Sequence, residues 1–90
     1  MIAMVTGASS GFGESISRQL VQAGYRVIGT GRRAERLAAL ADELGAQFLP
    51  LVFDVQDKVA TRAAIEGLPA AWQQVDLLVN NAGLALGLEP

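Results

Sequence analysis

A glycine-rich stretch, VTGASSGFGE at Val5–Glu14, has the clearest chemical meaning in this sequence. It contains three glycines and two serines, has no charge between Thr6 and Gly13, and directly follows a short apolar run. So little side chain lets another molecule approach the backbone closely. The residues that follow have helical spacing, and a helix N-terminus offers unpaired N–H groups and a partial positive charge. The stretch therefore predicts a site for a phosphate or pyrophosphate group.

The loop residues have distinct expected roles. Gly7 permits a tight turn, Gly11 a close approach of the backbone to the ligand, and Gly13 close packing of the helix on the strand. The alternative is a strand-to-helix turn that uses glycine only for its backbone angles. The residues expected to contact a nucleotide are consecutive: Gly7, Ala8, Ser9, Ser10, Gly11, Phe12 and Gly13.

Short apolar runs separated by segments of helical period must position this loop. The runs Ile2–Val5, Tyr25–Thr30, Gln47–Phe53 and Val75–Asn80 predict strands. The last contains Leu-Leu-Val without alternation, which is typical of a strand buried on both faces. Strands alternating with helices of about a dozen residues predict right-handed crossovers and a parallel sheet. The fold class is therefore α/β, with the order β-α-β-α-β-α-β.

Apolar stripes and capping residues delimit the predicted helices. Two stripes with helical spacing predict buried faces: Phe12, Ile16, Leu20 and Ala23, then Ala34, Leu37, Ala38, Ala41 and Leu44. Gly24 and Gly45 stand where each of these helices is expected to end. A third helix is expected to begin at Asp57, as its N-cap, and to end at Gly67–Pro69.

Composition excludes several classes of function. The 90 residues are 51% apolar and 18% charged, which excludes a disordered tail. Cysteine and histidine are both absent, so disulfides, thiolate metal sites, thiol nucleophiles and a histidine base are excluded, and no metal site is expected. A net charge of -2 gives no reason to expect a nucleic-acid or membrane partner. No apolar run reaches the roughly 18 residues of a membrane span, and a cytoplasmic protein is expected.

The end of the second predicted strand, Thr30-Gly31-Arg32-Arg33, indicates which dinucleotide would bind. Chains that bind NAD place a carboxylate there, roughly 20 residues past the glycine loop. Here no acid is present, and Arg32 and Arg33 can instead bind a 2′-phosphate through charge-assisted hydrogen bonds. The alternative is a solvated basic pair, but cations at a helix N-terminus are unfavourable, although Glu35 can relieve part of this cost. The pattern favours NADP over NAD.

Three motifs in order resemble those of the short-chain dehydrogenase/reductase family. The loop spacing is T-G-x-x-x-G-x-G rather than the G-x-G-x-x-G of most dinucleotide folds, Asp54–Val55 follows the third strand, and NNAG at Asn80–Gly83 follows the fourth. Further stretches, GRRAERLAALADELG, LPAAW and VNNAGLALGLEP, are similar to the NADP-dependent 3-hydroxy acid dehydrogenases of that family. That subgroup oxidises serine, allo-threonine and related 3-hydroxy acids, or reduces malonic semialdehyde.

The resemblance implies a Rossmann-type doubly wound parallel sheet with strand order 3-2-1-4, and NADP as cofactor. It implies that the Asp54 carboxylate accepts a hydrogen bond from the adenine amine while the Val55 N–H meets a ring nitrogen. The alternative for Asp54 is a strand-end residue that caps the next turn. Asn81 would lie near the cofactor ribose, and Asn80 would tie strands together. A small 3-hydroxy acid substrate and a homo-oligomer, usually a tetramer, are also implied.

The catalytic residues of that family are missing from this chain. The family uses a serine and a Tyr-x-x-x-Lys pair, whereas the only tyrosine is Tyr25 and the only lysine is Lys58. Residues 1–90 are therefore expected to be the N-terminal dinucleotide-binding part of one Rossmann domain, truncated before its catalytic half. The third helix would then cover its face of the sheet alone. That would expose the Leu-Leu-Val strand and parts of the first, leaving the isolated chain marginally stable or prone to aggregate.

Two other functions are compatible with parts of this pattern. A non-catalytic nucleotide-binding module, or an inactive fragment, needs nothing beyond the glycine loop and its sheet. A methyltransferase that uses S-adenosylmethionine has a similar half-sheet but expects an acid at the end of the second strand, which Gly31–Arg33 disfavours. A serine and a Tyr-x-x-x-Lys pair after Pro90 would distinguish the dehydrogenase from the binding module.

Overall fold

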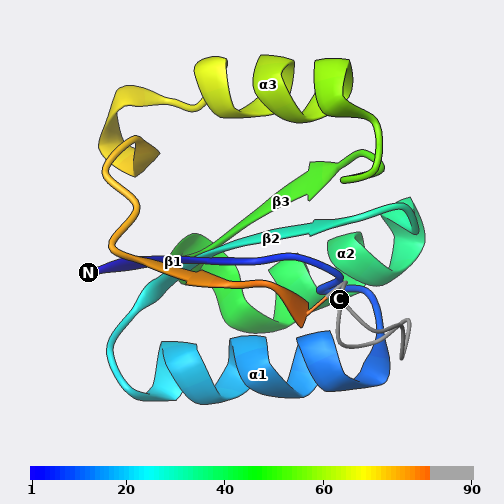
Figure 1. The fold of residues 1–90 in the computed structure, drawn as a ribbon. Coiled ribbons are helices and arrows are strands. Elements are labelled where there is room, and N and C mark those ends of the chain that lie inside the picture. Colours follow the sequence, from blue (N-terminus) through cyan, green and yellow to red (C-terminus); the bar gives the residue numbers. More distant parts are fainter. Residues whose placement is uncertain (82–90) are drawn as a thin grey trace.

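A parallel sheet of four strands forms the centre of the computed structural model, which describes residues 1–81 (Figure 1). The strands are β1 (Ile2–Val5), β2 (Arg26–Gly31), β3 (Phe48–Val52) and β4 (Leu77–Val79), in the spatial order β3-β2-β1-β4. All three pairings are parallel. The predicted α/β class and strand order 3-2-1-4 are confirmed, and each strand overlaps its predicted run.

Helices lie on both faces of the sheet. Figure 1 shows α1 (Gly11–Gln22) and α2 (Ala34–Leu44) below the strands and α3 (Lys58–Glu66) above them. Short 3₁₀ turns, η1 (Gly45–Gln47) and η2 (Ala70–Trp72), precede β3 and β4. This layering is what right-handed crossovers produce when the chain moves from β1 to β3 and then returns past β1 to β4.

The face that carries α1 and α2 contains the larger core. Its buried apolar side chains are Val5, Ala8, Val27, Leu37, Leu40 and Phe48. The Phe48 ring packs directly over β2 at Gly29, where a Cβ would overlap the ring. The close approach of this ring explains why β2 carries a glycine in the middle of a buried strand.

The predicted stripes of α1 and α2 are confirmed in part, because Ile16, Leu20, Leu37, Ala41 and Leu44 belong to the core or pack against it. The other members differ. Phe12 is 74% exposed and Ala23 is also exposed, whereas Gly13 and Ser17 are the buried residues of α1. In α2, Leu37 is buried as predicted, but Leu40 replaces the exposed Ala34 and Ala38. Small residues let α1 lie close to the sheet, and the Ser17 hydroxyl donates to the Gly13 carbonyl at 2.8 Å. A pattern of apolar residues alone misses this contact because serine and glycine are not counted in it.

The opposite face is covered by the segment after α3 rather than by α3 itself. Leu68 packs with Ile2, Met4 and Ile28, and Trp72 lies against this cluster. No residue of α3 is buried, and every residue of β1 is. The predictions that α3 alone would cover this face, and that parts of the first strand would be exposed, are therefore wrong. Leu68 lies in a connection and Trp72 in the short turn η2, and neither segment is long enough for periodicity to identify residues that contact the core.

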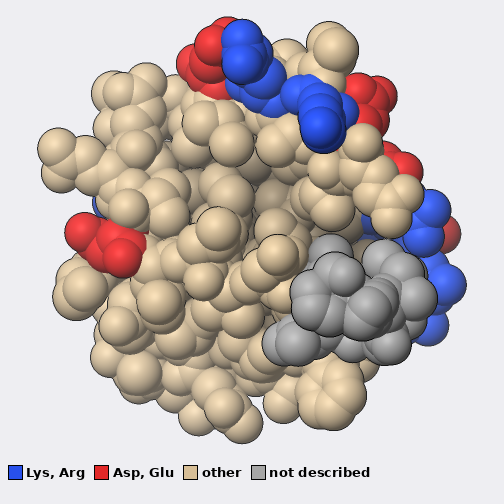
Figure 2. Space-filling model, in the orientation of Figure 1, with Lys and Arg blue, Asp and Glu red and all other residues tan. Residues whose placement is uncertain are grey.

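The β4 strand is an exposed edge in the described residues, as predicted. Leu77 is 38% exposed and Leu78 is 61% exposed. Figure 2 shows that this side of the molecule is uncharged across its middle, with charged side chains gathered at its margin. At the start of β4 the Asp76 carboxylate accepts from the Ile2 N–H at 2.9 Å. The pairing with β1 brings the next residues, Asn80 and Asn81, beside the glycine loop.

Candidate functional site

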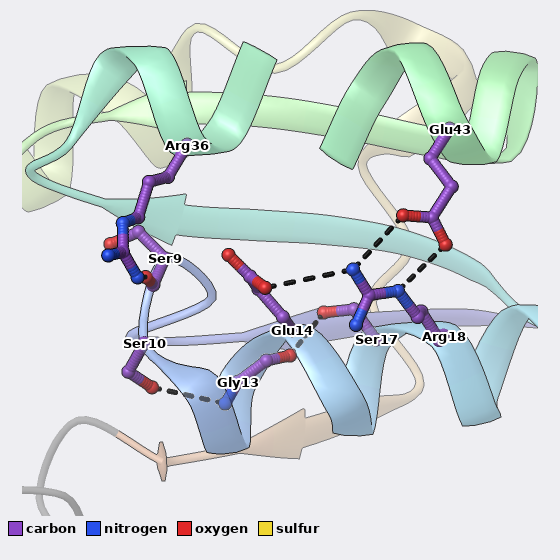
Figure 3. Close-up of polar contacts among 8 residues, drawn as sticks. All are labelled: Ser9, Ser10, Gly13, Glu14, Ser17, Arg18, Arg36 and Glu43. Carbon is purple, nitrogen blue, oxygen red and sulfur yellow. Dashed lines mark hydrogen bonds and ion pairs between the residues drawn. The ribbon is translucent and has the colours of Figure 1, made fainter. Parts of the chain in front are cut away.

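The glycine loop between β1 and α1 makes a tight turn. Gly7 has a φ of 69°, in the left-handed region that favours glycine. Its carbonyl oxygen accepts from the Ser10 hydroxyl at 2.8 Å and from the Ser10 N–H at 3.1 Å. Ser10 is also the N-cap of α1, because its hydroxyl oxygen accepts from the Gly13 N–H at 3.1 Å (Figure 3). The turn predicted for Gly7 is confirmed.

Gly11 and Gly13 have different surroundings although they lie two residues apart. A Cβ at Gly13 would overlap the Gly7 carbonyl oxygen, so only glycine lets α1 begin this close to the loop. The close packing predicted for Gly13 is therefore present, with the loop as its partner. A Cβ at Gly11 would meet nothing within 4 Å. The space over Gly11 is open on the protein side, as a site for an incoming phosphate requires.

The end of β4 holds the loop in place. The Asn81 side chain is 2% exposed, and its Nδ2 donates to the Gly7 carbonyl and to the Ser10 hydroxyl, both at 3.1 Å. Thr6 donates to the Asn80 Oδ1 at 3.1 Å, so Asn80 ties β4 to β1 as expected. Asn81 is thus a buried support of the loop, and its expected contact with a ribose stays a prediction. The rest of the NNAG motif, residues 82–83, lies outside the described residues.

A cavity of about 360 Å³ opens beside the loop, at the carboxyl ends of β1, β2 and β3. This is the edge of a doubly wound sheet where ligands are usually found. Its lining comes from the loop, from the β2–α2 connection and from the β3–α3 connection. The lining residues are Gly7, Ser9, Ser10, Gly11, Gly31, Arg32, Arg33, Arg36, Phe53, Asp54, Val55 and Gln56.

Three arginines give this cavity a positive wall. Arg32 and Arg33 follow β2, and Arg36 lies one turn further along, in α2. Within residues 1–81 none of them forms an ion pair, whereas Arg18 donates to both carboxylate oxygens of Glu43, at 2.7 and 3.0 Å. That contact raises the pKa of Arg18 and lowers the pKa of Glu43. The cavity arginines have no such partner and are available to an anion.

The β3–α3 connection supplies the other side of the cavity. The Asp54 Oδ1 accepts from the Gln56 N–H at 2.9 Å, and the Asp57 Oδ1 caps α3 by accepting from the Ala60 N–H at 3.0 Å. Asp54 thus shapes its own turn while it lines the cavity, and Asp57 has the capping role predicted for it. Beside Asp54, Val55 lines the cavity as well.

The structure gathers most of the predicted contact residues and adds others. Ala8 and Gly13 are buried behind the loop, Phe12 is exposed, and Asn81 is buried, so these residues do not line the cavity. The cavity residues that the sequence patterns missed are Gly31, Arg36, Phe53 and Gln56. A signal was present for Arg36, because it lies in the first turn of the helix that follows Arg32 and Arg33. Within residues 1–81 no group of three acidic side chains is placed to hold a metal ion.

Comparison with known proteins identifies the family. The family model described as short chain dehydrogenase matches residues 1–89. The chain belongs to the short-chain dehydrogenase family. A probable NADP-dependent dehydrogenase of Haemophilus influenzae is 64% identical over 98% of this chain and 35% of its own length. An NADP-dependent 3-hydroxy acid dehydrogenase of Salmonella typhi is 57% identical over the whole chain and 36% of its own length.

Solved structures of this dehydrogenase family share the fold. The closed form of a serine dehydrogenase complexed with NADP⁺ has a TM-score of 0.87 and 49% identity, over 90% of this chain and 33% of that chain. The Rossmann-type architecture inferred from the sequence is thereby confirmed. The chain spans about a third of the length of the curated relatives it matches. None of the helices within residues 1–81 has the length and hydropathy that a membrane crossing requires.

Proposed function

We propose that this chain is the cofactor-binding part of an NADP-dependent oxidoreductase. The observation that carries the proposal is the cavity beside the glycine loop. Within residues 1–81 its Arg32 and Arg33 have no carboxylate partner, and Gly31 occupies the place of the acid that NAD-binding chains use. A Cβ at Gly31 would lie 2.5 Å from the Ser9 hydroxyl oxygen. An aspartate at residue 31 would therefore crowd the loop as well as repel a phosphate.

The residues that line the cavity fit the phosphate groups of NADP. The open backbone at Gly11 and the first N–H groups of α1 suit the pyrophosphate, and the arginines suit a 2′-phosphate. We assign cofactor contacts to the predicted residues that line the cavity, Gly7, Ser9, Ser10, Gly11, Arg32, Arg33, Asp54 and Val55. The contacts expected of Ala8, Phe12, Gly13 and Asn81 stay predictions. When bound, NADP would supply the hydride acceptor or donor, and the cavity residues would bind and orient it.

The names of similar proteins support one class of substrate. Similar proteins are named for 3-hydroxy acids and for serine, which supports hydride transfer at carbon 3 of a small 3-hydroxy acid such as serine, allo-threonine or 3-hydroxypropionate. Residues 1–90 contain no Tyr-x-x-x-Lys pair, so we assign no catalytic residue to them and expect them to be inactive alone. A tetrameric assembly and a cytoplasmic location stay predictions from the family resemblance.

The test uses the complete gene product that contains this sequence. We expect it to bind NADP more tightly than NAD and to reduce NADP⁺ when serine, allo-threonine or 3-hydroxypropionate is supplied. Absorbance at the wavelength of reduced nicotinamide measures the reaction, and calorimetry measures binding. Tight binding of NADP without turnover of any hydroxy acid would favour the alternative, a non-catalytic nucleotide-binding module. No binding of either dinucleotide would refute the proposal.

A further inference from the structure

The helix α2 differs from its neighbours in having no side-chain N-cap. Ser10 caps α1 and Asp57 caps α3, each by accepting from a backbone N–H of the first turn. The N-cap of α2 is Arg33, whose carbonyl oxygen accepts from the Leu37 N–H at 3.1 Å but whose side chain caps no N–H of that helix. The first N–H groups of a helix have no partner within it, so α2 begins with donors that no protein side chain satisfies in the described residues.

Arg36 adds a third cation where the helix dipole already disfavours one. It lies in the first turn of α2, three residues after Arg33. Within residues 1–81 neither Arg36 nor Arg32 forms an ion pair with an acidic side chain. Glu35 is the acidic residue of that turn, and it is exposed. A positive charge at a helix N-terminus is unfavourable, whereas an anion bound there is favourable.

The position of Arg36 directs it towards the cavity. Its Nη1 donates to the Ser9 carbonyl oxygen at 3.5 Å, so the guanidinium of this exposed residue lies beside the glycine loop (Figure 3). A guanidinium has five N–H donors, and this bond uses one of them. The Ser9 hydroxyl faces Gly31 and forms no hydrogen bond with the described residues. Donors from the loop and from α2 therefore converge on one side of the cavity.

We propose that Arg36 is a third specificity residue for the 2′-phosphate, and that this phosphate serves as the missing N-cap of α2. The inference rests on the proposed function, because it assigns a further residue to the same cofactor site. Arg36 gives the phosphate a donor from within the helix, while Arg32 and Arg33 approach it from the β2–α2 connection. Its hydrogen bond to Ser9 positions the guanidinium across the gap between the helix and the loop.

The experiment compares Arg36→Ala, Arg36→Lys and the control Arg62→Ala in the complete gene product. Arg62 is an exposed arginine of α3 outside this cavity, so its loss matches the change in net charge. Calorimetric titration with NADP and with NAD gives both dissociation constants, and urea unfolding without ligand monitors the fold. We expect Arg36→Ala to raise the Kd for NADP about tenfold and to change the Kd for NAD by less than about twofold. Lysine should restore part of the affinity, because it keeps the charge but not the planar donor pair.

Three other results would contradict the role proposed for Arg36 or the proposed function. Equal weakening of NADP and NAD would show that Arg36 only supports the loop through Ser9, and would overturn the inference. Unchanged NADP affinity in Arg36→Ala would also overturn the inference. In that case, a loss of NADP preference in the Arg32→Ala/Arg33→Ala double variant would show that the proposed function still stands. A wild-type protein that binds neither dinucleotide would overturn the proposed function and this inference together.

Discussion

The same substitution at two glycines of the loop should have opposite consequences. We expect Gly13→Ala to destabilise the fold and Gly11→Ala to leave it intact while weakening cofactor binding. A Cβ at residue 13 would overlap the carbonyl oxygen of Gly7, whereas a Cβ at residue 11 would meet nothing within 4 Å. Neither residue has a positive φ, so alanine is compatible with both backbone conformations.

The magnitude for Gly13→Ala follows from what the Gly7 carbonyl holds. That oxygen accepts from the Ser10 hydroxyl, the Ser10 N–H and Asn81 Nδ2. Moving it to admit a methyl group costs about 1–3 kcal/mol for overpacking, and each hydrogen bond lost adds roughly 0.5–1.5 kcal/mol. Replacing glycine in a helix returns about 0.5–1 kcal/mol, so the loss of one or two of these hydrogen bonds leaves a net loss of about 2–4 kcal/mol. At Gly11 only the favourable helix term applies.

Urea unfolding of the complete gene product, without ligand and with NADP or NAD, measures both effects. Gly13→Ala should lower the unfolding midpoint without ligand. Gly11→Ala should keep or slightly raise that midpoint, but lose affinity for both NADP and NAD because the methyl group occupies the space meant for the pyrophosphate. The reasoning would be refuted by a Gly13→Ala protein as stable as wild type, or by a Gly11→Ala protein that binds NADP normally.

Other predictions address the arginines, a helix cap and the exposed edge. Arg32→Ala with Arg33→Ala should weaken NADP binding by about 2–4 kcal/mol and barely change NAD binding, whereas equal losses in calorimetry would show that the pair supports the fold. Asp57→Ala should lower the free energy of unfolding by about 0.5–2 kcal/mol through loss of the α3 cap, whereas Asp57→Asn should retain most of the stability. Equal urea midpoints for the alanine and asparagine variants would contradict the capping role. Residues 1–90 alone should be marginally stable or self-associate through the exposed β4 edge, and a cooperative, monomeric transition in analytical ultracentrifugation and thermal melting would count against this.

The strand order and the position of the site could be predicted because both depend on local sequence signals. Buried parallel strands appear as continuous apolar runs, and residues such as Asp57 and Gly45 mark helix boundaries that need no tertiary information. The glycine spacing placed the loop at a strand-to-helix junction, so the cavity beside Gly7 and Gly11 followed from topology.

The features that could not be predicted from the sequence depend on how helices, strands and loops pack against one another. The fully buried residues of α1 are Gly13 and Ser17, which are small enough for close packing but carry no apolar signal. Coverage of the second face by Leu68 and Trp72 comes from a segment without periodicity. The presence of Arg36 in the cavity depends on the rotation of α2 above the loop, a tertiary property that spacing alone suggests but does not determine.

The hydrogen bonds from Asn81 to the glycine loop also bear on the order of folding. They join residues 74 and 71 positions apart, so the loop is synthesised long before its buried partner leaves the ribosome. The strands β1, β2 and β3 can pair in the meantime, because the ends to be joined are much closer in sequence. The loop gains its final support only when β4 has paired with β1. Nucleotide affinity during synthesis would therefore report the arrival of the fourth strand rather than the formation of the first three.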